Sequence, residues 1–344
     1  MPEQSRDAPP RRRDSAGAPG SLTLAEARRF SLNKMAEIQS TLTEVGWDSL
    51  ETVFMAGSLG RLEAHPDSDF DCVIIARSGG PHSQLERQVN ALFRALSQCA
   101  LKLPKADGIY RQPTSVEALL DPAMRGALGE EPAVFGKRMQ CLLDARPVLH
   151  VDRFQSLRRK ILRWYVGGHE NSAGNFDFGL LLDDLCRYRH AYRAWQMFKF
   201  EHSETDSWAL RQAKLGGSRV LTFAGLLFLL GASTAQSDPW TWVETRLDLT
   251  PLERLEETMC PVSPARFARV AQASECIHRE LSSAFRRGRL LREGPTSAET
   301  LGRWDTAAGT DLLAALEVVR AELTAFLLEQ ASRWDPRFFS LLII

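Results

Sequence analysis

The sequence predicts an α+β protein, with a small mixed β-sheet flanked by helices in its first part and an all-α region after it. Short apolar runs rich in β-forming residues and bounded by glycine-containing turns lie before about residue 152. Beyond that point, apolar residues recur every three or four positions, which is typical of helices. We therefore expect a tail at 1–20, a first domain at 21–150 and an α-helical domain at 151–344.

The first domain is expected to contain a helix, two buried strands and a second helix. Thr23 and the glutamate three residues later are spaced as a capping box, which begins a helix that runs to about Val45. Apolar runs at 52–56 and 70–76 predict buried strands, and the apolar periodicity of 84–103 predicts a helix that crosses back over the sheet. Further strands are expected at 108–112 and 140–143.

The remaining segments have simpler interpretations. Residues 1–20 are rich in Pro, Arg, Ser and Gly and contain too few large apolar side chains to offset the entropy of ordering, so they predict a flexible tail. The most apolar stretch, 220–230, is about half the roughly 20 residues that a membrane span needs. It is predicted as a buried helix, and no membrane partner is expected. A last helix is expected at 311–331.

Composition excludes several classes of protein. The 43 basic and 43 acidic residues balance, so a nucleic-acid partner held mainly through its phosphates is not expected. The six cysteines include no C-x-x-C pair, which argues against a zinc or disulfide framework. The N-terminal sequence has no secretory h-region, which predicts a cytoplasmic protein with reduced thiols.

The residues that point to chemistry lie between the two predicted strands. Asp69 and Asp71 are two positions apart at the mouth of a strand, so both carboxylates lie on one face, about 7 Å apart at the backbone. Converging oxygen ligands of this kind suit Mg²⁺ or Mn²⁺. Such ions can stabilise the attacking and leaving oxygens of a phosphoryl or nucleotidyl displacement.

The residues before the aspartate pair are suited to a phosphate. Gly57 lets backbone N–H groups approach an anion closely, and the hydroxyl of Ser58 adds a donor. Gly60 gives the loop freedom, and Arg61 supplies a planar, permanently charged fork for a phosphate oxygen. Each feature alone is common, but the ordered set between two strands is specific.

This segment resembles the nucleotidyltransferase superfamily that includes DNA polymerase β. It is most similar to the branch of the bacterial protein-PII uridylyltransferase and its uncharacterised relatives, in which the segment reads Gly-x-Gly-Arg-x-Glu-x-x-Pro-x-Ser-Asp-x-Asp. A run at 142–148, Leu-Leu-Asp-Ala-Arg-Pro-Val, is similar to one that these relatives carry at the end of the catalytic domain. The matching positions are Gly60-Arg61, Glu63, Pro66, Ser68-Asp69 and Asp71.

The resemblance implies a nucleotidyltransferase domain at 21–150 and a divalent metal held by Asp69 and Asp71. The implied reaction moves a nucleoside monophosphate from a nucleoside triphosphate, ATP by default, to an unknown hydroxyl acceptor on a protein or small molecule, and releases pyrophosphate. The alternative is a nucleotide-binding sensor or interaction protein of the same fold with weak or no activity.

The superfamily usually has a third carboxylate on a later strand. Asp107 is the first candidate, as a metal ligand and as the base that deprotonates the acceptor, although an Asp-Gly pair is also common in turns. Asp144 is a second candidate, with a structural ion pair to Arg146 as the simpler interpretation.

The helical domain is expected to complete the nucleotide site. Arg211, Lys214 and Ser218 share one helical face at positions i, i+3 and i+7, and this face could bind the β- and γ-phosphates. Tyr188 or Tyr192 could stack on the base. A solvated charged face is the alternative interpretation of the same spacing.

Overall fold

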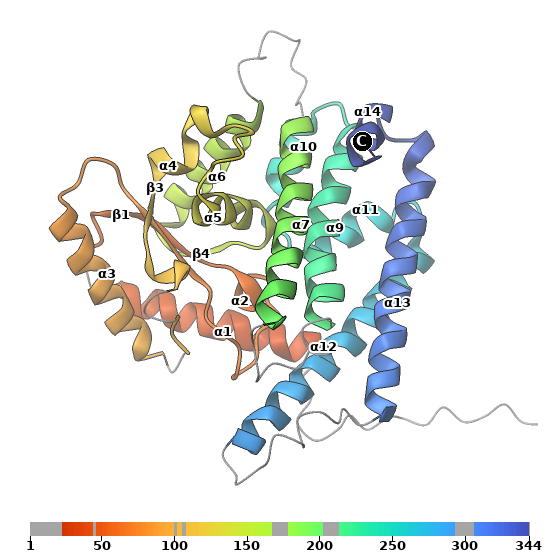
Figure 1. The fold of residues 1–344 in the computed structure, drawn as a ribbon, viewed down its shortest axis with the longest axis horizontal. Helices are drawn as coiled ribbons and strands as arrows, with labels where there is room; N and C mark the ends of the chain where they lie inside the picture. Colours follow the sequence, from red (N-terminus) through yellow and green to blue (C-terminus); the bar gives the residue numbers. More distant parts are fainter. Residues whose placement is uncertain are drawn as a thin grey trace, which may run out of the picture.

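The computed structural model describes residues 23–43, 46–99, 102–104, 108–166, 178–201, 213–292 and 306–343. The protein is mixed α/β, about 70% helical, with one small mixed sheet of four strands (Figure 1). This agrees with the mixture of sheet and helices that the sequence predicts. The sheet lies in the first half of the chain, and long helices fill the second half of the described residues.

The sheet has the strand order β3-β2-β1-β4. The central strand β1 (Leu50–Met55) pairs antiparallel with β2 (Cys72–Ala76) on one side and with β4 (Arg146–Leu149) on the other. The short strand β3 (Thr114–Ser115) is parallel to β2. Both strands that flank the 57–71 segment therefore have a neighbour on each side, which fixes the two ends of that segment.

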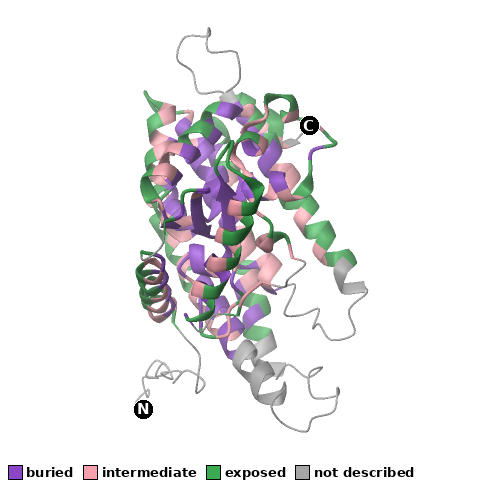
Figure 2. Cartoon of the chain, turned by 90° about the vertical axis from the view of Figure 1, so that its left-hand side faces the viewer, coloured by how far each residue is buried: buried purple, intermediate pink, exposed green. Residues whose placement is uncertain are grey.

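Helices cover both faces of the sheet. Because successive side chains of a strand point to opposite faces, Val53 and Phe54 enter different hydrophobic clusters. Val53 packs with α1 (Leu24–Leu42) and α3 (His82–Ser97), whereas Phe54 packs with helices of the opposite layer. Those opposite helices are α5 (Pro132–Leu143) and α6 (Val151–Val166). Figure 2 shows the strands as a buried centre between helices with exposed outer sides.

The hydrophobic cluster on the Phe54 side continues into the helical half. It joins Phe54 and Val73 of the sheet to Leu226 of α9 (Ser218–Ser233) and Phe326 of α13 (Thr306–Glu329). The predicted domain boundary near 150 thus falls between β4 and α6, with a continuous core on both sides of it.

The apolar stretch predicted as a buried helix is the centre of α9, and most of its side chains are buried. Within the described ranges, the helical segment Ala213–Ser233 is long and apolar enough to cross a membrane by length and composition. Its most apolar window is 61% buried inside the protein, and the core helix of a soluble protein passes the same test.

The remaining elements complete the two layers and the helical half (Figure 1). They are α2 (Gly57–Gly60), η1 (Ile109–Arg111), α4 (Val116–Leu120), η2 (Pro122–Met124), α7 (Gly179–Glu201), α10 (Pro239–Arg246), α11 (Pro251–Met259), α12 (Pro264–Arg292), η4 (Gln330–Ser332) and α14 (Pro336–Ile343).

Several predicted elements are confirmed, but two segments predicted as strands are helical. The capping box of Thr23 and Glu26 is present at the start of α1, which ends at Leu42. The strand expected at 108–112 is the 3-10 helix η1, and the strand expected at 140–143 is the last turn of α5. A short apolar run cannot distinguish a strand from a buried helix, and the last turn of α5 is buried all round because it packs between the sheet and other helices.

The α2 turn leaves no space for a side chain at Gly60. A Cβ there would overlap the backbone oxygen of Asp144 and lie 2.6 Å from the backbone oxygen of Met55. We therefore expect Gly60→Ala to destabilise the protein by about 3 kcal/mol in urea denaturation. The matched control Gly80→Ala, with no atom within 4 Å of the added Cβ, is expected to change stability by less than about 0.5 kcal/mol. Equal stabilities of the two variants would contradict this packing.

Candidate functional site

The turn after β1 brings the predicted glycine and serine against the second strand. Gly57 has a φ of 65°, a left-handed conformation that favours glycine, and it begins α2. A Cβ on Gly57 would overlap Oδ2 of Asp71 and lie 3.0 Å from its Cγ. The hydroxyl-bearing Ser58 follows directly and is partly exposed. The Gly57-Ser58 turn therefore lies directly against the carboxylate of Asp71.

Asp71 is held at the start of β2 and carries a carboxylate with altered acidity. Its backbone oxygen accepts a hydrogen bond of 2.9 Å from the N–H of Ala56, which ties the ends of β1 and β2 together. Burial raises the pKa of Asp71 to about 6. The charge of Arg219 opposes this rise in pKa, whereas the neighbouring carboxylate of Asp144 adds to it.

Asp144 provides a second carboxylate at the same place. It follows the last residue of α5, and its side chain is 1% exposed. Its Oδ2 accepts a hydrogen bond of 2.7 Å from Nη1 of Arg61, whereas its Oδ1 is buried and has no hydrogen-bond partner among the described residues. An unpaired buried carboxylate oxygen is costly, so Oδ1 marks a position at which a cation or a donor would be stabilised.

Arg61 has two carboxylate partners inside the protein. Its side chain is 7% exposed, and its Nε donates to Oε2 of Glu63 at 2.9 Å while its Nη1 donates to Asp144. The sequence predicts a phosphate-binding fork for this residue. The geometry instead gives it the function of neutralising Asp144 and tying the 57–71 segment to the end of α5.

Arg219, in the first turn of α9, is a cation that sequence reasoning did not select. Its Nη1 lies 3.8 Å from Oδ2 of Asp144, beyond hydrogen-bond distance, and its side chain is 24% exposed. Its Cζ lies 4.9 Å from the centre of the Tyr192 ring. A guanidinium beside two carboxylates, yet not hydrogen-bonded to Asp144, is suited to an anionic ligand.

Of the two other predicted acids, the structure describes only Asp69. The side chain of Asp69 is 65% exposed, and its Oδ1 lies 2.5 Å from Nζ of Lys102. It is close enough to Asp71 to contribute to the raised pKa of that residue. Asp107 lies outside the described residues.

The structure describes only part of the predicted cationic stripe of Arg211, Lys214 and Ser218. The chain departs from helical geometry at Gly217, with a ψ of −107°, so Lys214 and Ser218 lie on either side of a break. Arg211 lies outside the described residues. Tyr188 and Tyr192 do lie near the carboxylates: their rings are stacked with centroids 6.0 Å apart, and Arg219 contacts the Tyr192 face.

The ion pair between Asp144 and Arg146, which the sequence offered as the simpler function of Asp144, is wrong. Arg146 donates instead to the backbone oxygens of Gly60 and Asp248, at 3.0 and 3.1 Å. The cations beside the Asp144 carboxylate are therefore Arg61 and Arg219. The sequence signal for Arg219 was a single charge at the start of the most apolar stretch of the chain, directly after Gly216 and Gly217.

Among the described residues, no group of three or more His, Cys, Asp or Glu side chains is placed to hold a metal ion. Any ion at this site would therefore take two protein carboxylates and complete its coordination with ligand or water oxygens. This is the usual arrangement for Mg²⁺ at a site that also binds substrate phosphates.

Neither a scan against models of known protein families nor a search of curated proteins finds a match to this chain.

The raised pKa of Asp71 has a consequence for stability. In the folded protein this carboxyl keeps its proton up to about pH 6, whereas the unfolded chain loses it near 3.8, so folding stability falls as pH rises through this window. We expect Asp71→Asn, measured in EDTA, to raise the free energy of unfolding at pH 7.5 by about 2 kcal/mol. The gain is expected to vanish below pH 4. A variant less stable than wild type at pH 7.5 would contradict the burial of this charge.

Proposed function

We propose that this protein is a divalent-metal-dependent nucleotidyltransferase whose site lies between the 57–71 segment and the end of α5. The observation that carries the proposal is that Asp71 and Asp144 lie near each other beside Arg219, with one buried oxygen of Asp144 unpaired among the described residues. Asp144 contributes to the raised pKa of Asp71, which is the effect of one carboxylate on a neighbouring one, and a cation between them would relieve the repulsion. The resemblance of 57–71 to the nucleotidyltransferase superfamily supports the same chemistry.

Asp71 and Asp144 would hold Mg²⁺ or Mn²⁺, with the phosphate oxygens of the nucleotide as further ligands. Asp69, the other acid expected to bind metal, could join them by giving up its pair with Lys102. An exposed ion pair of this kind contributes at most about 1 kcal/mol, so a metal ion could replace it. When bound, the ion neutralises charge on the phosphates and polarises the α-phosphoryl group.

The triphosphate would be bound by Arg219 and the Gly57-Ser58 turn. Arg219 offers a planar fork of N–H donors, and the first N–H groups of the α2 turn have no partner within that turn. Ser58 adds its hydroxyl. The half-buried, stacked pair of Tyr188 and Tyr192 would provide an aromatic surface for the base.

In the proposed reaction the acceptor oxygen forms a bond to the α-phosphorus and the bond from that phosphorus to the β-phosphate oxygen breaks. Pyrophosphate leaves with that bonding electron pair. The hydroxyl proton passes to a carboxylate of the site, the function that the sequence predicts for Asp107. Positioning and charge neutralisation would supply most of the rate, as in phosphoryl transfer generally.

The test is pyrophosphate release by the purified full chain with each of the four nucleoside triphosphates and a lysate as the source of acceptor. We expect release with one nucleotide that depends on Mg²⁺ or Mn²⁺. Asp71→Asn and Asp144→Asn should each lower it at least about a hundredfold, because each removes a proposed metal ligand. Arg219→Ala should lower it through a higher KM for the nucleotide.

Asp152→Asn is the matched control, because Asp152 is an exposed aspartate in the first turn of α6, and it should retain full release. Nucleotide binding without release above the Asp71→Asn level would exclude the transferase and favour the sensor. Release that survives both site variants would place the chemistry elsewhere in the chain.

A further inference from the structure

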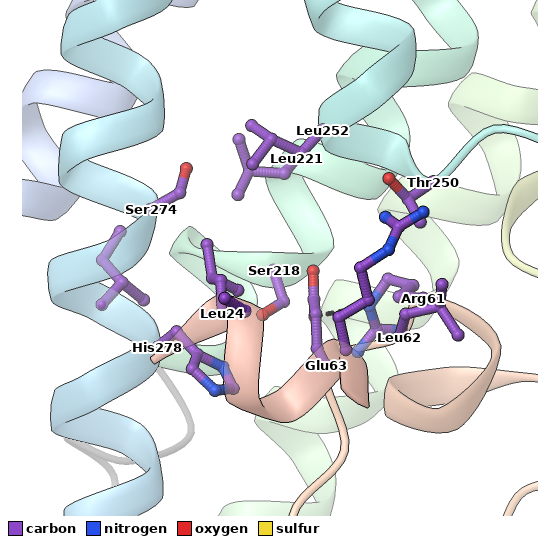
Figure 3. Close-up of a pocket in the computed structure, with 13 residues that line it drawn as sticks. Leu24, Arg61, Leu62, Glu63, Ser218, Leu221, Thr250, Leu252, Ser274 and His278 are labelled. Atoms are coloured by element: carbon purple, nitrogen blue, oxygen red, sulfur yellow. Dashed lines mark hydrogen bonds and ion pairs between the residues drawn. The ribbon is translucent and has the colours of Figure 1, made fainter. Parts of the chain in front are cut away.

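A cavity lies next to the proposed site, between the first turn of α1, the loop at Arg61–Glu63 and helices α9, α11 and α12 (Figure 3). Its volume is about 180 Å³. Pockets for drug-sized ligands are roughly 300–1,000 Å³, so this one suits a smaller molecule. Its walls are largely aliphatic: Leu24, Leu62, Leu221, Leu252 and Ile277.

His278 provides a buried polar group at this cavity. The residue is 8% exposed, and its Nε2 is buried without a hydrogen-bond partner among the described residues. Burial lowers the pKa of His278, against the charges of Glu63 and Glu275 that raise it, so the ring is neutral at pH 7. A neutral imidazole can present Nε2 as an acceptor, and that acceptor is unused.

Glu63 provides the charge. Oε2 of its carboxylate accepts a hydrogen bond from Arg61. Glu63 also lines the cavity, where its side chain and that of His278 face the same space (Figure 3). The side chain of Glu63 is 14% exposed, so a ligand that contacts it would be largely shielded from water. A carboxylate beside an imidazole acceptor forms an edge suited to hydrogen-bond donors.

The cations at this cavity are already paired. Arg61 donates to Glu63 and Asp144, and Arg28, at the outer wall, donates to Glu253 at 2.7 Å. An anionic ligand would therefore meet no unpaired cation among the described residues that line the cavity, whereas Glu63 is paired with Arg61 through Oε2 alone. A ligand with a positive head and an aliphatic body would instead place its charge on Glu63 and its carbons on the leucine and isoleucine walls.

We propose that this cavity binds a small aliphatic primary ammonium, with the head on Glu63 and Nε2 of His278 and the body between Leu221, Leu252 and Ile277. The backbone N–H of Leu24 is held by Oε2 of Glu275 at 3.1 Å, and Leu24 itself is half-buried, so the first turn of α1 closes the cavity through a few polar contacts.

The test is a titration of the full chain, labelled with ¹³C in the Leu and Ile methyl groups, followed by NMR. The probes are 3-methylbutylamine, L-leucine and 3-methylbutanoate, which share one branched carbon body. We expect saturable shifts of the Ile277 methyl signals with the amine and none with the acid. If L-leucine saturates the shifts at a lower concentration than the amine does, the ligand is an amino acid. If the amine saturates them at the lower concentration, the ligand is a simple amine.

Two variants test the assignment by different routes. Glu63→Gln should weaken amine binding at least about tenfold, because it removes the charge. Leu24→Trp should abolish binding by filling the volume from the half-buried wall, without touching Arg61. Glu37→Gln, an exposed glutamate of α1, is the matched control and should bind as wild type. Equal binding of the acid and the amine, no saturable shift, or unchanged binding in Leu24→Trp would overturn the proposal.

Discussion

The structure depends on the close approach of one short turn to two acidic residues that come from distant parts of the chain. Gly57 touches the carboxylate of Asp71, and Gly60 touches the backbone of Asp144. Neither position has room for a side chain, and central strand β1 fixes the start of the turn through pairing on both sides. This close approach brings Asp71 and Asp144 to the same turn, and the proposed chemistry depends on their being neighbours.

The proximity of Asp71 and Asp144 concentrates charge inside the protein, and the surrounding residues compensate for only part of it. Arg61 neutralises Asp144 through a hydrogen-bonded pair, whereas Arg219 lies 3.8 Å away. One oxygen of Asp144 has no partner in the described part of the chain, and the pKa of Asp71 is still raised. Incomplete compensation of buried charge is costly in a resting protein. It is expected where a ligand with both positive and negative parts, such as a metal–triphosphate complex, completes the electrostatics.

Sequence reasoning found the local features and missed those that depend on packing. The capping box of α1 and the buried helix around 220–230 follow from local patterns and are confirmed. The last turn of α5 was predicted as a strand, because an apolar run of four residues has no period that separates the two structures. Arg61 was predicted to bind phosphate because its type suits one, but its buried partners Glu63 and Asp144 are visible only in three dimensions. Arg219 likewise becomes a candidate only once α9 is packed beside the end of α5.

The most direct test of the central claim is the effect of Mg²⁺ on nucleotide affinity, measured by calorimetry with a non-hydrolysable triphosphate analogue in Mg²⁺ and in EDTA. If Asp71 and Asp144 hold a metal that bridges to the phosphates, Mg²⁺ should tighten binding to wild type at least about tenfold. In Asp71→Asn the enhancement should disappear, while the affinity in EDTA should rise because a negative charge facing the phosphates is removed. The same affinity with and without Mg²⁺ in wild type would contradict the account.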